Sequence, residues 1–597
     1  MDTQDVISPE QAVTLHGLFV ERARRTPDKV AYRHFYQNAW TDVPWREMRN
    51  QVARWQAALG KEGLQPGDRV AIMLRNCPQW MMFDQAAMSL GLVVVPLYTI
   101  DRPDNLAYIM NNAGVKVLMF ETAEQWQALC TVREQLQSMV RFISLETIRD
   151  TAEPRLRSAS EYLPAAAELQ PAPPTRMDEL ASIIYTSGTT GKSKGVMLSH
   201  ANMLTNAYAS LDTFTVHGDD LYLSFLPLSH TFERTCGYYL AVMTGATVAF
   251  ARSIPLLSED LQTIKPTIMV SVPRIYERIY GAINAKLDEG SPIKRKLFNL
   301  AVNTGWARFE YEQGRGGWKI SFLLWPVLQK LVAQKILDRL GGRLRVAISG
   351  GAALAPEISR VFVGLGLPVV QGYGLTETSP IVTGNKLENN FPDSVGQPIS
   401  DVQIRLGENN ALLVKGPNVM MGYWDNPEAT RAMIDADGWL NTGDTARISA
   451  TGHVYITGRI KEIIVMSNGE KIPPSDMELA ILRDPLFDQV MVLGEARPYL
   501  VVVAVLNPSV WLLFASETGV RPDMPEALTD SRVQGKVLQR IAVHLREFPG
   551  YAKVNRVLLL QEPWGIENGF LTPTLKLKRA KVTEHFSAEI KQLYEGH

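Results

Sequence analysis

The sequence predicts an α/β protein with more than one domain, and three observations support this prediction. The chain has 597 residues, which is more than a single hydrophobic core usually serves. Between Thr14 and Gln170, segments with helical periodicity alternate with short apolar runs, a pattern typical of a parallel sheet covered by helices. A further apolar run at 180–185 leads into a loop of glycine and hydroxyl residues, as expected for a strand that presents a phosphate-binding loop.

The local patterns of the N-terminal part predict its elements in chain order. Apolar residues recur at helical spacing in two segments, 45–60 and 79–91. Short apolar runs predict three strands, at 69–74, 93–97 and 115–120. Residues 151–175 are rich in proline, alanine and charge, so we expect a loop that leads to the strand at 180–185.

Composition excludes several classes of protein. Hydrophobic residues make up 46% and charged residues 21% of the chain, as in ordinary soluble globular proteins. The formal net charge of −1 provides no basic field that would attract nucleic acid. The three cysteines, Cys77, Cys130 and Cys236, lie far apart, which predicts a reducing compartment and no metal site built from thiolates.

Two segments bear on where the protein works. The N-terminal residues MDTQDVISPEQ are acidic and polar, which is not the pattern of a signal peptide. The most apolar early segment, 81–98, is interrupted by Asp84 and Gln85, and we do not expect it to span a membrane. We therefore expect a cytoplasmic protein, with contact to the inner face of a membrane left open.

The loop after the strand at 180–185 is suited to polyphosphate. Residues 186–195 read TSGTTGKSKG, and their hydroxyls, glycine N–H groups and lysines can all bind phosphate. The loop is not a P-loop, because that pattern requires glycine where this chain has Thr186. Taken alone, the loop is also compatible with a glycine-rich surface turn.

The same ten residues resemble the signature T-S-G-T-T-G-x-P-K-G of the adenylate-forming enzymes, a family that includes acyl-CoA synthetases, luciferases and the adenylation domains of peptide synthetases. Ser193 replaces the family's proline, which loosens the turn but removes no phosphate-binding group. The resemblance implies that ATP phosphates are bound by Thr186, Ser187, Gly188, Thr189, Thr190, Gly191 and Lys194.

Further motifs of this family follow in the family's order. Residues 371–378 read QGYGLTET, and the resemblance implies that Tyr373 stacks on adenine, Thr376 binds the α-phosphate and Glu377 holds Mg²⁺. The other residues that it implies around the nucleotide are Gly350, Gly351, Ala352, Gln371, Gly372, Gly374, Asp444 and Arg459. An isolated aspartate or arginine would more often be a solvated surface charge.

Three regions resemble the long-chain acyl-CoA synthetase branch: 221–234, 266–280 and 568–579. Residues 221–234, LYLSFLPLSHTFER, contain His230, which the resemblance puts between the carboxylate and adenylate sites; a lone histidine is as often a structural group. A Ser-His hydrolase dyad is not supported, because Ser229, which precedes His230, does not lie in a G-x-S-x-G nucleophile elbow. In 568–579, NGFLTPTLKLKR, the resemblance assigns the catalytic lysine to Lys576, with Lys578 as the second candidate and a solvated strand edge as the structural alternative.

The resemblance also implies a domain arrangement. It predicts an N-terminal domain, residues 1–458, with two α/β subdomains and a small β-barrel. A hinge at 459–463 contains Lys461, and a small mobile α+β C-terminal domain spans 464–597.

The activity implied is that of a long-chain fatty acid–CoA ligase. ATP with Mg²⁺ and a fatty acid would give acyl-AMP and pyrophosphate, and CoA would then give acyl-CoA and AMP. The alternatives are an enzyme that delivers the acyl group to an acyl carrier protein and a fatty-acid-binding relic without catalysis. A homodimer is compatible with the sequence.

The stretch 286–340 has two interpretations. Residues at helical spacing, Trp325, Leu328, Val332, Ile336 and Leu340, predict a helix that packs in the core. Alternatively, the stretch forms a membrane-facing patch, because basic residues flank an apolar cluster. The basic residues are Lys294, Arg295, Lys296, Arg315 and Lys319, and the apolar residues are Trp318, Phe322, Leu323, Leu324 and Trp325.

Overall fold

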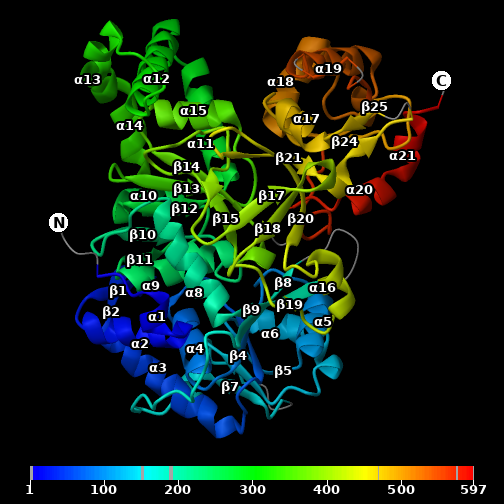
Figure 1. Cartoon of the computed structure of the whole chain (residues 1–597). Helices are drawn as coiled ribbons and strands as arrows, with labels where there is room; N and C mark the ends of the chain where they lie inside the picture. The colour runs from blue at the N-terminus through cyan, green and yellow to red at the C-terminus, as the bar shows by residue number, and fades with distance from the viewer. Residues whose placement is uncertain are drawn as a thin grey trace.

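The protein has a large N-terminal body and a smaller C-terminal body (Figure 1). The structure is a computed structural model that describes residues 5–149, 153–186, 193–467, 470–546, 548–550, 552–572 and 576–595, without the side chains of Lys461 and Lys471. Its mixture of helices with parallel and antiparallel sheets confirms the predicted fold class.

The described residues of the first subdomain form an eight-stranded sheet with the order β19-β9-β8-β4-β3-β5-β6-β7. Its strands are β3 (Arg69–Met73), β4 (Val93–Pro96), β5 (Val115–Phe120), β6 (Arg141–Ser144), β7 (Leu156–Ser158), β8 (Leu180–Thr186), β9 (Lys194–Ser199) and β19 (Gly422–Tyr423). The strands from β8 to β7 are parallel, whereas β9 is antiparallel to β8. Helices α3 (Trp45–Leu59), α4 (Pro78–Ser89), α5 (Pro103–Ala113) and α6 (Ala123–Cys130) belong to this part of the chain. The predicted helices and strands of this region are confirmed.

The predicted loop at 151–175 is wrong in its middle. Leu156 and Ser158 are buried and pair with Phe142 and Ser144 to form β7, and the short helix α7 (Ala159–Tyr162) follows. A strand of three residues has too few positions to show a hydrophobic pattern, and the surrounding prolines and charges conceal it.

The second subdomain contains a nine-stranded sheet within the described residues, with the order β16-β15-β14-β13-β12-β10-β11-β1-β2. The strands are β1 (Val30–Tyr36), β2 (Ala39–Pro44), β10 (Leu221–Ser224), β11 (Thr247–Phe250), β12 (Ile268–Ser271), β13 (Val346–Ser349), β14 (Val369–Gly374), β15 (Ile381–Gly384) and β16 (Gln397–Pro398). Because β12, β13 and β14 are parallel neighbours, their carboxyl ends and the residues that follow lie at one edge of the sheet.

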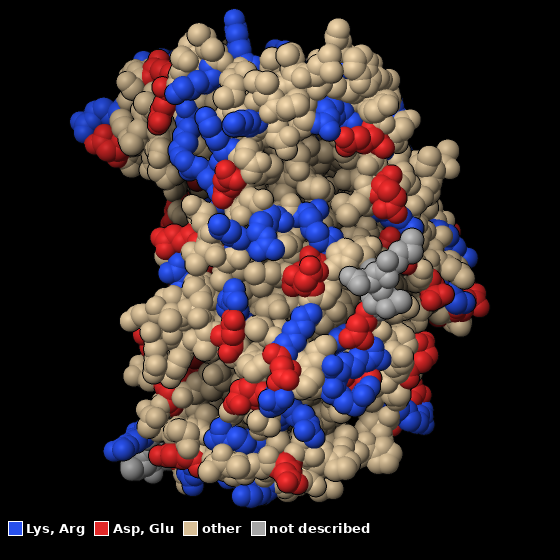
Figure 2. Space-filling view, turned by 90° about the vertical axis from the view of Figure 1, so that its left-hand side faces the viewer, with Lys and Arg blue, Asp and Glu red and all other residues tan. Residues whose placement is uncertain are grey.

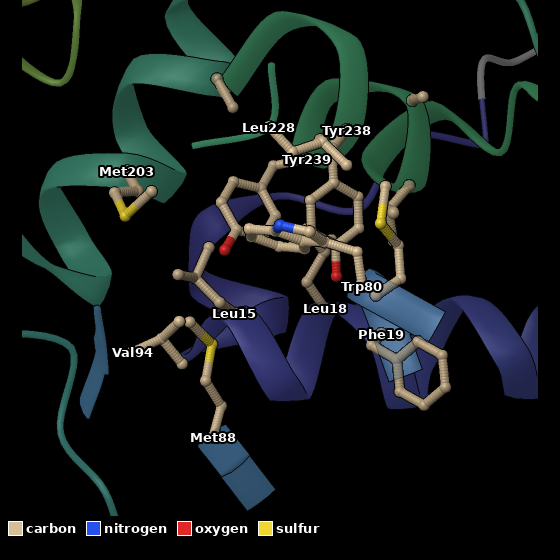
Figure 3. Close-up of a cluster of buried hydrophobic side chains, with 14 of the residues drawn as sticks. Leu15, Leu18, Phe19, Trp80, Met88, Val94, Met203, Leu228, Tyr238 and Tyr239 are labelled. Atoms are coloured by element: carbon tan, nitrogen blue, oxygen red, sulfur yellow. The ribbon is translucent and has the colours of Figure 1, made fainter. Parts of the chain in front are cut away.

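A buried ion pair connects the two subdomains. Asp84 on α4 lies 2.6 Å from Arg234 in the π-helix Glu233–Tyr239, and both side chains are fully buried. Arg234 also donates to the hydroxyl of Ser182 in β8 and lies over the ring of Trp80. Figure 3 shows Trp80 with the two tyrosines of the π-helix, among apolar side chains from both subdomains. The strand before the predicted phosphate loop is thereby fastened to the segment that follows His230.

A third sheet lies where a small β-barrel is expected. It is antiparallel, with the order β17 (Gln403–Leu406), β18 (Ala411–Lys415), β20 (Leu440–Ile448) and β21 (Val454–Arg459). The two edge strands are not paired with each other in the described residues, so this sheet is open rather than closed into a barrel.

The C-terminal residues form a core of their own. This core contains β24 (Phe487–Leu493), β25 (Leu500–Leu506), β26 (Val554–Leu560) and helices α17 (Pro474–Ile481), α18 (Pro508–Thr518) and α19 (Ser531–His544). The small helices α20 (Arg579–His585) and α21 (Ser587–Gln592) follow the loop that carries Lys576.

The connection from β12 to β13 forms a helical projection (Figure 1). It consists of α11 (Pro273–Asp288), α12 (Pro292–Glu312) and a helical segment, 320–340, that includes α13 (Trp325–Leu328) and α14 (Gln334–Leu337). Trp325 and Leu328 are buried against α12, which confirms the predicted core-packing face. The assignment of Trp325 to an outward patch is therefore wrong, and Arg315 is bound to Glu310 rather than free.

Candidate active site

Three predicted nucleotide-binding residues meet where β14 approaches the third sheet. The hydroxyl of Tyr373 donates a hydrogen bond of 2.5 Å to Oδ2 of Asp444. Arg459 is paired with Asp444 across β20 and β21, and its Nε lies 3.2 Å from Oδ1. Burial raises the pKa of Asp444, against the opposing effects of Arg459 and the Tyr373 hydroxyl. The cluster combines an aromatic ring with groups that can bind ribose hydroxyls.

Lys576 reaches this cluster from the C-terminal domain. Its ammonium interacts electrostatically with Asp444, Glu377 and Glu462. Desolvation and the charge of Arg459 lower the pKa of Lys576, and the three carboxylates oppose that change. The residue is exposed to solvent, although neighbouring protein atoms desolvate its ammonium group. This combination is expected for a lysine that borders a ligand site.

The loop around Lys576 distinguishes it from Lys578. The N–H of Lys576 donates to Oγ1 of Thr572 at 3.0 Å, and the N–H of Thr572 donates to the Lys576 carbonyl at 2.8 Å. Lys578 instead lies near Asp101 and Arg102, outside the Asp444 cluster, and desolvation lowers its pKa. The structure thus places Lys576, and not Lys578, beside the predicted nucleotide site.

Glu377 is connected to the phosphate-loop strands through a tyrosine. It lies in the 3₁₀ turn Thr376–Thr378 after β14, and its Oε1 accepts a hydrogen bond of 2.8 Å from the hydroxyl of Tyr423. Nζ of Lys194 lies 5.1 Å from the centre of the Tyr423 ring. Because β19 pairs with β9, the carboxylate and the lysine border the same region.

The carboxylate oxygens of Glu377 suit a hard cation, but they do not provide a complete coordination shell. The side chain is half-buried, and the contact with Tyr423 engages one carboxylate oxygen. Over the described residues, no group of three or more His, Cys, Asp or Glu side chains gathers as a metal site. Magnesium usually combines one or two carboxylates with waters and substrate phosphates, so Glu377 suits such a site.

The predicted phosphate loop joins two antiparallel strands. Thr186 ends β8, Lys194 begins β9, and these two residues face each other in the register. The five residues Ser187, Gly188, Thr189, Thr190 and Gly191 lie outside the described residues, so their phosphate contacts stay a prediction.

His230 lies after β10, in a position that keeps its ring neutral. Its Nδ1 accepts a hydrogen bond of 3.2 Å from the N–H of Phe232. Desolvation and the charge of Lys576 lower its pKa to about 4, so the imidazole carries no charge at neutral pH. Phe232 covers Gly350, where a Cβ atom would lie 2.9 Å from the ring. His230 therefore lies beside an apolar surface that also borders the predicted adenine turn.

Comparisons with known proteins now bear on this site. The family model of the AMP-binding enzymes matches residues 19–424, and the model of the AMP-binding enzyme C-terminal domain matches residues 461–597. The chain belongs to the AMP-binding enzyme family.

Individual relatives specify the branch. The chain is 33% identical over 569 residues to long chain acyl-CoA synthetase 6, peroxisomal, of Arabidopsis thaliana, covering 90% of this chain and 79% of that protein. It is 30% identical over 592 residues to long-chain-fatty-acid–CoA ligase FadD15 of Mycobacterium tuberculosis, covering 97% and 96%. Within the family, the chain groups with the long-chain acyl-CoA synthetases.

Solved structures share the fold at lower sequence identity. The A domain of carboxylic acid reductase from Segniliparus rugosus, in complex with AMP and a co-purified carboxylic acid, matches with a TM-score of 0.76 at 22% identity, covering 100% of this chain and 98% of that chain. ATP-bound MatB from Rhodopseudomonas palustris matches with a TM-score of 0.70 at 21% identity, covering 96% and 99%. At this identity, the comparison establishes the fold alone.

Some predicted nucleotide contacts of this AMP-binding enzyme have structural roles. Oε1 of Gln371 accepts from the N–H of Leu354, and its Nε2 donates to the carbonyl of Pro392, so both ends of the buried amide are bound within the protein. A Cβ on Gly374 would lie 1.9 Å from the carbonyl oxygen of Pro380, so packing alone requires glycine there. A predicted ligand residue can therefore be needed for the shape of the site.

The remaining predicted residues lie close to the same strand ends. Gly350, Gly351 and Ala352 follow β13, and Gly351 has a φ of +81°, which favours glycine. Gly372 is in β14, and Thr376 is half-buried in the turn after it. The backbone of Lys461 lies in a 3₁₀ turn, and its side chain is outside the described part of the structure.

Sequence reasoning missed two residues of this AMP-binding enzyme's site. Tyr423 is 46 residues from Glu377 along the chain, and the two are brought together by tertiary contacts, including a hydrogen bond from the N–H of Met420 to the Glu377 carbonyl. Glu462 acts electrostatically on Lys576 from the segment where the hinge is predicted. The aromatic run Gly422–Trp424 was the only signal available for Tyr423, and nothing in its spacing relates it to a carboxylate.

Glu233 predicts a pH dependence of stability. Its side chain is buried, Oε2 has no hydrogen-bond partner in the described structure, and burial raises its pKa to about 8. Folding therefore retains a proton that the unfolded chain releases above about pH 4.5, and stability from this group falls as pH rises toward 8. We compare the free energy of unfolding of Glu233→Gln with that of wild type at about pH 5.5 and at about pH 8.5. We expect the difference to shift in favour of the variant by at least about 1 kcal/mol between the two pH values. Urea midpoints at the two pH values measure this difference, and an equal difference at both would contradict it.

Proposed function

We propose that this protein is a long-chain fatty acid–CoA ligase that works through an acyl-AMP intermediate. The observation that carries the proposal is the position of Lys576, which comes from the C-terminal domain and lies within electrostatic range of Asp444 and Glu377 of the N-terminal domain. This position puts the Lys576 ammonium where the substrate carboxylate and a nucleotide phosphate would be brought together. The relatives named as long-chain fatty acid–CoA ligases support the choice of substrates.

In the first half-reaction, the fatty carboxylate itself is the nucleophile. One of its oxygens attacks the α-phosphorus of ATP, and the bond to the β-phosphate breaks to release pyrophosphate. Lys576 and Thr376 would neutralise and bind the crowded oxygens, while the loop between β8 and β9 would hold the departing phosphates. Glu377 would hold Mg²⁺, which supplies positive charge to the phosphates when bound. Tyr423 would keep the carboxylate of Glu377 in position.

The nucleoside would be held by the cluster beyond β14. Tyr373 would stack on adenine, and Asp444 with Arg459 would bind the ribose hydroxyls. His230, neutral at pH 7, would lie between the carboxylate and the adenylate without adding charge to the apolar acyl region.

In the second half-reaction, the thiol of CoA attacks the acyl carbonyl and AMP leaves. We propose that the C-terminal domain rotates about the hinge at 459–463, with Lys461 in it, and withdraws Lys576 from the site. The ion pair between Arg483 and Glu357, 3.0 Å apart across the two domains, would separate in that rotation. The domain limits 1–458 and 464–597 are part of this proposal.

The proposed location is the cytoplasm, with contact to the inner face of a membrane. A bilayer-dissolved fatty acid would be accessible from that position. A homodimer stays a prediction, and sedimentation of the purified protein tests it.

The direct experiment combines purified protein and Mg-ATP with carboxylic acids from acetate to stearate, with and without CoA. Mass spectrometry would detect acyl-AMP, acyl-CoA and pyrophosphate. We expect CoA-dependent thioester with the long-chain acids. Bound acyl-AMP without thioester would instead indicate an acyl carrier protein as acceptor, and no adenylate with any acid would indicate a binding protein without catalysis.

A further inference from the structure

The helical projection between β12 and β13 has one face that the protein covers and one that it leaves exposed. Trp325, Leu328 and Ala333 are buried in a small cluster with α12 and Leu365. This contact fixes the rotation of the segment 320–340, and with it the set of side chains that point outward. The side chains that point outward are therefore determined by the packing of this segment on α12.

The outward face is an apolar stripe. It consists of Ile320, Leu323, Leu324, Val327 and Leu331, which are 76%, 69%, 51%, 57% and 47% exposed. Their spacing follows one face of a helix. Trp318, which is 57% exposed, lies beside the stripe at its N-terminal end. Single exposed leucines are common on soluble proteins, but a continuous stripe of this kind marks an interaction surface.

An aromatic hollow adjoins this stripe. A cavity of about 370 Å³ is lined by apolar and aromatic side chains and by the ion pair of Arg308 with Glu312. The other lining residues are Tyr311, Trp318, Phe322, Leu323, Trp325 and Pro326. Tryptophan and tyrosine favour the boundary between apolar chains and water, because their rings are apolar and their N–H or O–H groups are polar. The hollow therefore extends the apolar surface with side chains suited to an interface.

Basic side chains border the apolar stripe. Lys319, Lys330 and Lys335 are exposed, and no ion pair is found for them within the described residues. The acids of the neighbouring helix are already engaged, since Glu310 binds Arg315 and Glu312 binds Arg308. Figure 2 faces this side of the molecule, and the upper region shows broad uncharged surface with Lys and Arg gathered along its border.

The segment 320–340 is suited to lie on a bilayer rather than to cross it. The segment has 21 residues, and an 18-residue window within it has a mean hydropathy of 1.3, so by length and composition it could span a membrane. However, its inner face is packed on α12, and only residues 341–345 separate its C-terminal end from β13, a strand of the nine-stranded sheet. Crossing would require the segment to leave this core, whereas contact in the plane of the interface requires only the exposed stripe.

We propose that this stripe docks the protein on an anionic lipid bilayer, with the apolar side chains among the acyl chains and the three lysines at the headgroups. Charge favours this occupant over a second copy of the chain. A two-fold interface through the stripe would bring lysines of both copies together, whereas anionic headgroups attract them. Binding to the bilayer does not depend on the proposed function. Only the expected change in KM for a fatty acid in vesicles rests on the proposed function.

The test is flotation of the full-length protein with vesicles of phosphatidylcholine alone or mixed with phosphatidylglycerol. We expect wild type to float with the mixed vesicles and to be released by salt. The variant Leu323→Ser/Leu324→Ser/Val327→Ser should lose at least about tenfold in binding. The variant Lys319→Gln/Lys330→Gln/Lys335→Gln should lose its preference for phosphatidylglycerol. A matched control, Leu512→Ser/Leu513→Ser, changes exposed leucines on α18 and should float as wild type does.

Three outcomes would overturn the proposal: wild type that does not float, a stripe variant that floats like wild type, or a stripe variant whose main effect is to dissociate a dimer in light scattering. Thioester formation with a water-soluble acid, measured in parallel, should be equal in wild type and the stripe variant, which shows that the variant is folded. With a fatty acid supplied in mixed vesicles, the stripe variant should have a raised KM. If no acid gives thioester, the proposed function fails while the flotation result still stands.

Discussion

Replacing Lys576 by alanine should lower acid-dependent pyrophosphate release by about 100-fold or more, because it removes the charge that we propose to stabilise the reacting oxygens. Conversion of supplied acyl-AMP and CoA to thioester should proceed at close to the wild-type rate, since the proposed mechanism uses Lys576 only in the first half-reaction. Single-turnover measurements of the two half-reactions test this division. In wild type, adenylation should also decline on the alkaline side below the usual lysine pKa, since desolvation lowers the pKa of Lys576.

The matched control for this experiment is Lys578→Ala. Lys578 is on the same loop but lies near Asp101 and Arg102, away from Asp444. Its loss should change adenylation by less than about fivefold, the effect of a weak ion pair. Equal loss of both half-reactions in Lys576→Ala, or an equal effect of the two alanine variants, would contradict the assignment.

The second large effect concerns stability. Asp84→Asn keeps the size of the side chain but leaves Arg234 fully buried without a counter-ion. We expect the free energy of unfolding of the N-terminal domain to fall by about 3–5 kcal/mol. The measurement is the urea midpoint of that domain at an unchanged slope. Because Arg234 also binds Ser182 in β8, activity should fall with it.

Two controls isolate the contribution of burial. Asp42 and Arg33 form an ion pair at the same N–O distance, 2.6 Å, but at the surface, so Asp42→Asn should cost less than about 1 kcal/mol. The double variant Asp84→Leu/Arg234→Met removes both charges and should recover at least half of the loss. If the double variant is as unstable as Asp84→Asn, the cost arises from packing and not from the unpaired charge.

Much of the fold follows from local patterns. The predicted helices and strands between residues 45 and 120 are at the predicted places, because the helices show helical spacing of apolar residues and the strands are short apolar runs. The predicted loop at 151–175 hides β7, whose three residues are too few to show a period. The stripe at 320–340 shows the converse problem: apolar residues occupy both faces, so the sequence could not decide that Trp325 packs inward while Leu324 points out.

The site is predictable only where motifs carry it. Tyr373, Asp444 and Arg459 were assigned by resemblance, and the structure brings them into one cluster. Tyr423 was missed because its contact with Glu377 is a tertiary contact between segments that are distant in the sequence. Asp84 and Arg234 were not recognised as a pair, since an acid and a base 150 residues apart give no local signal.

Transfer of oxygen from the fatty acid to AMP tests the central claim most directly. The carboxyl group of palmitate is labelled with ¹⁸O at both oxygens, the protein is supplied with Mg-ATP and CoA, and the released AMP is examined by mass spectrometry. Attack of the carboxylate on the α-phosphorus predicts one ¹⁸O atom in each AMP formed with acyl-CoA. Unlabelled AMP, or ADP as the nucleotide product, would contradict an acyl-AMP intermediate in this protein.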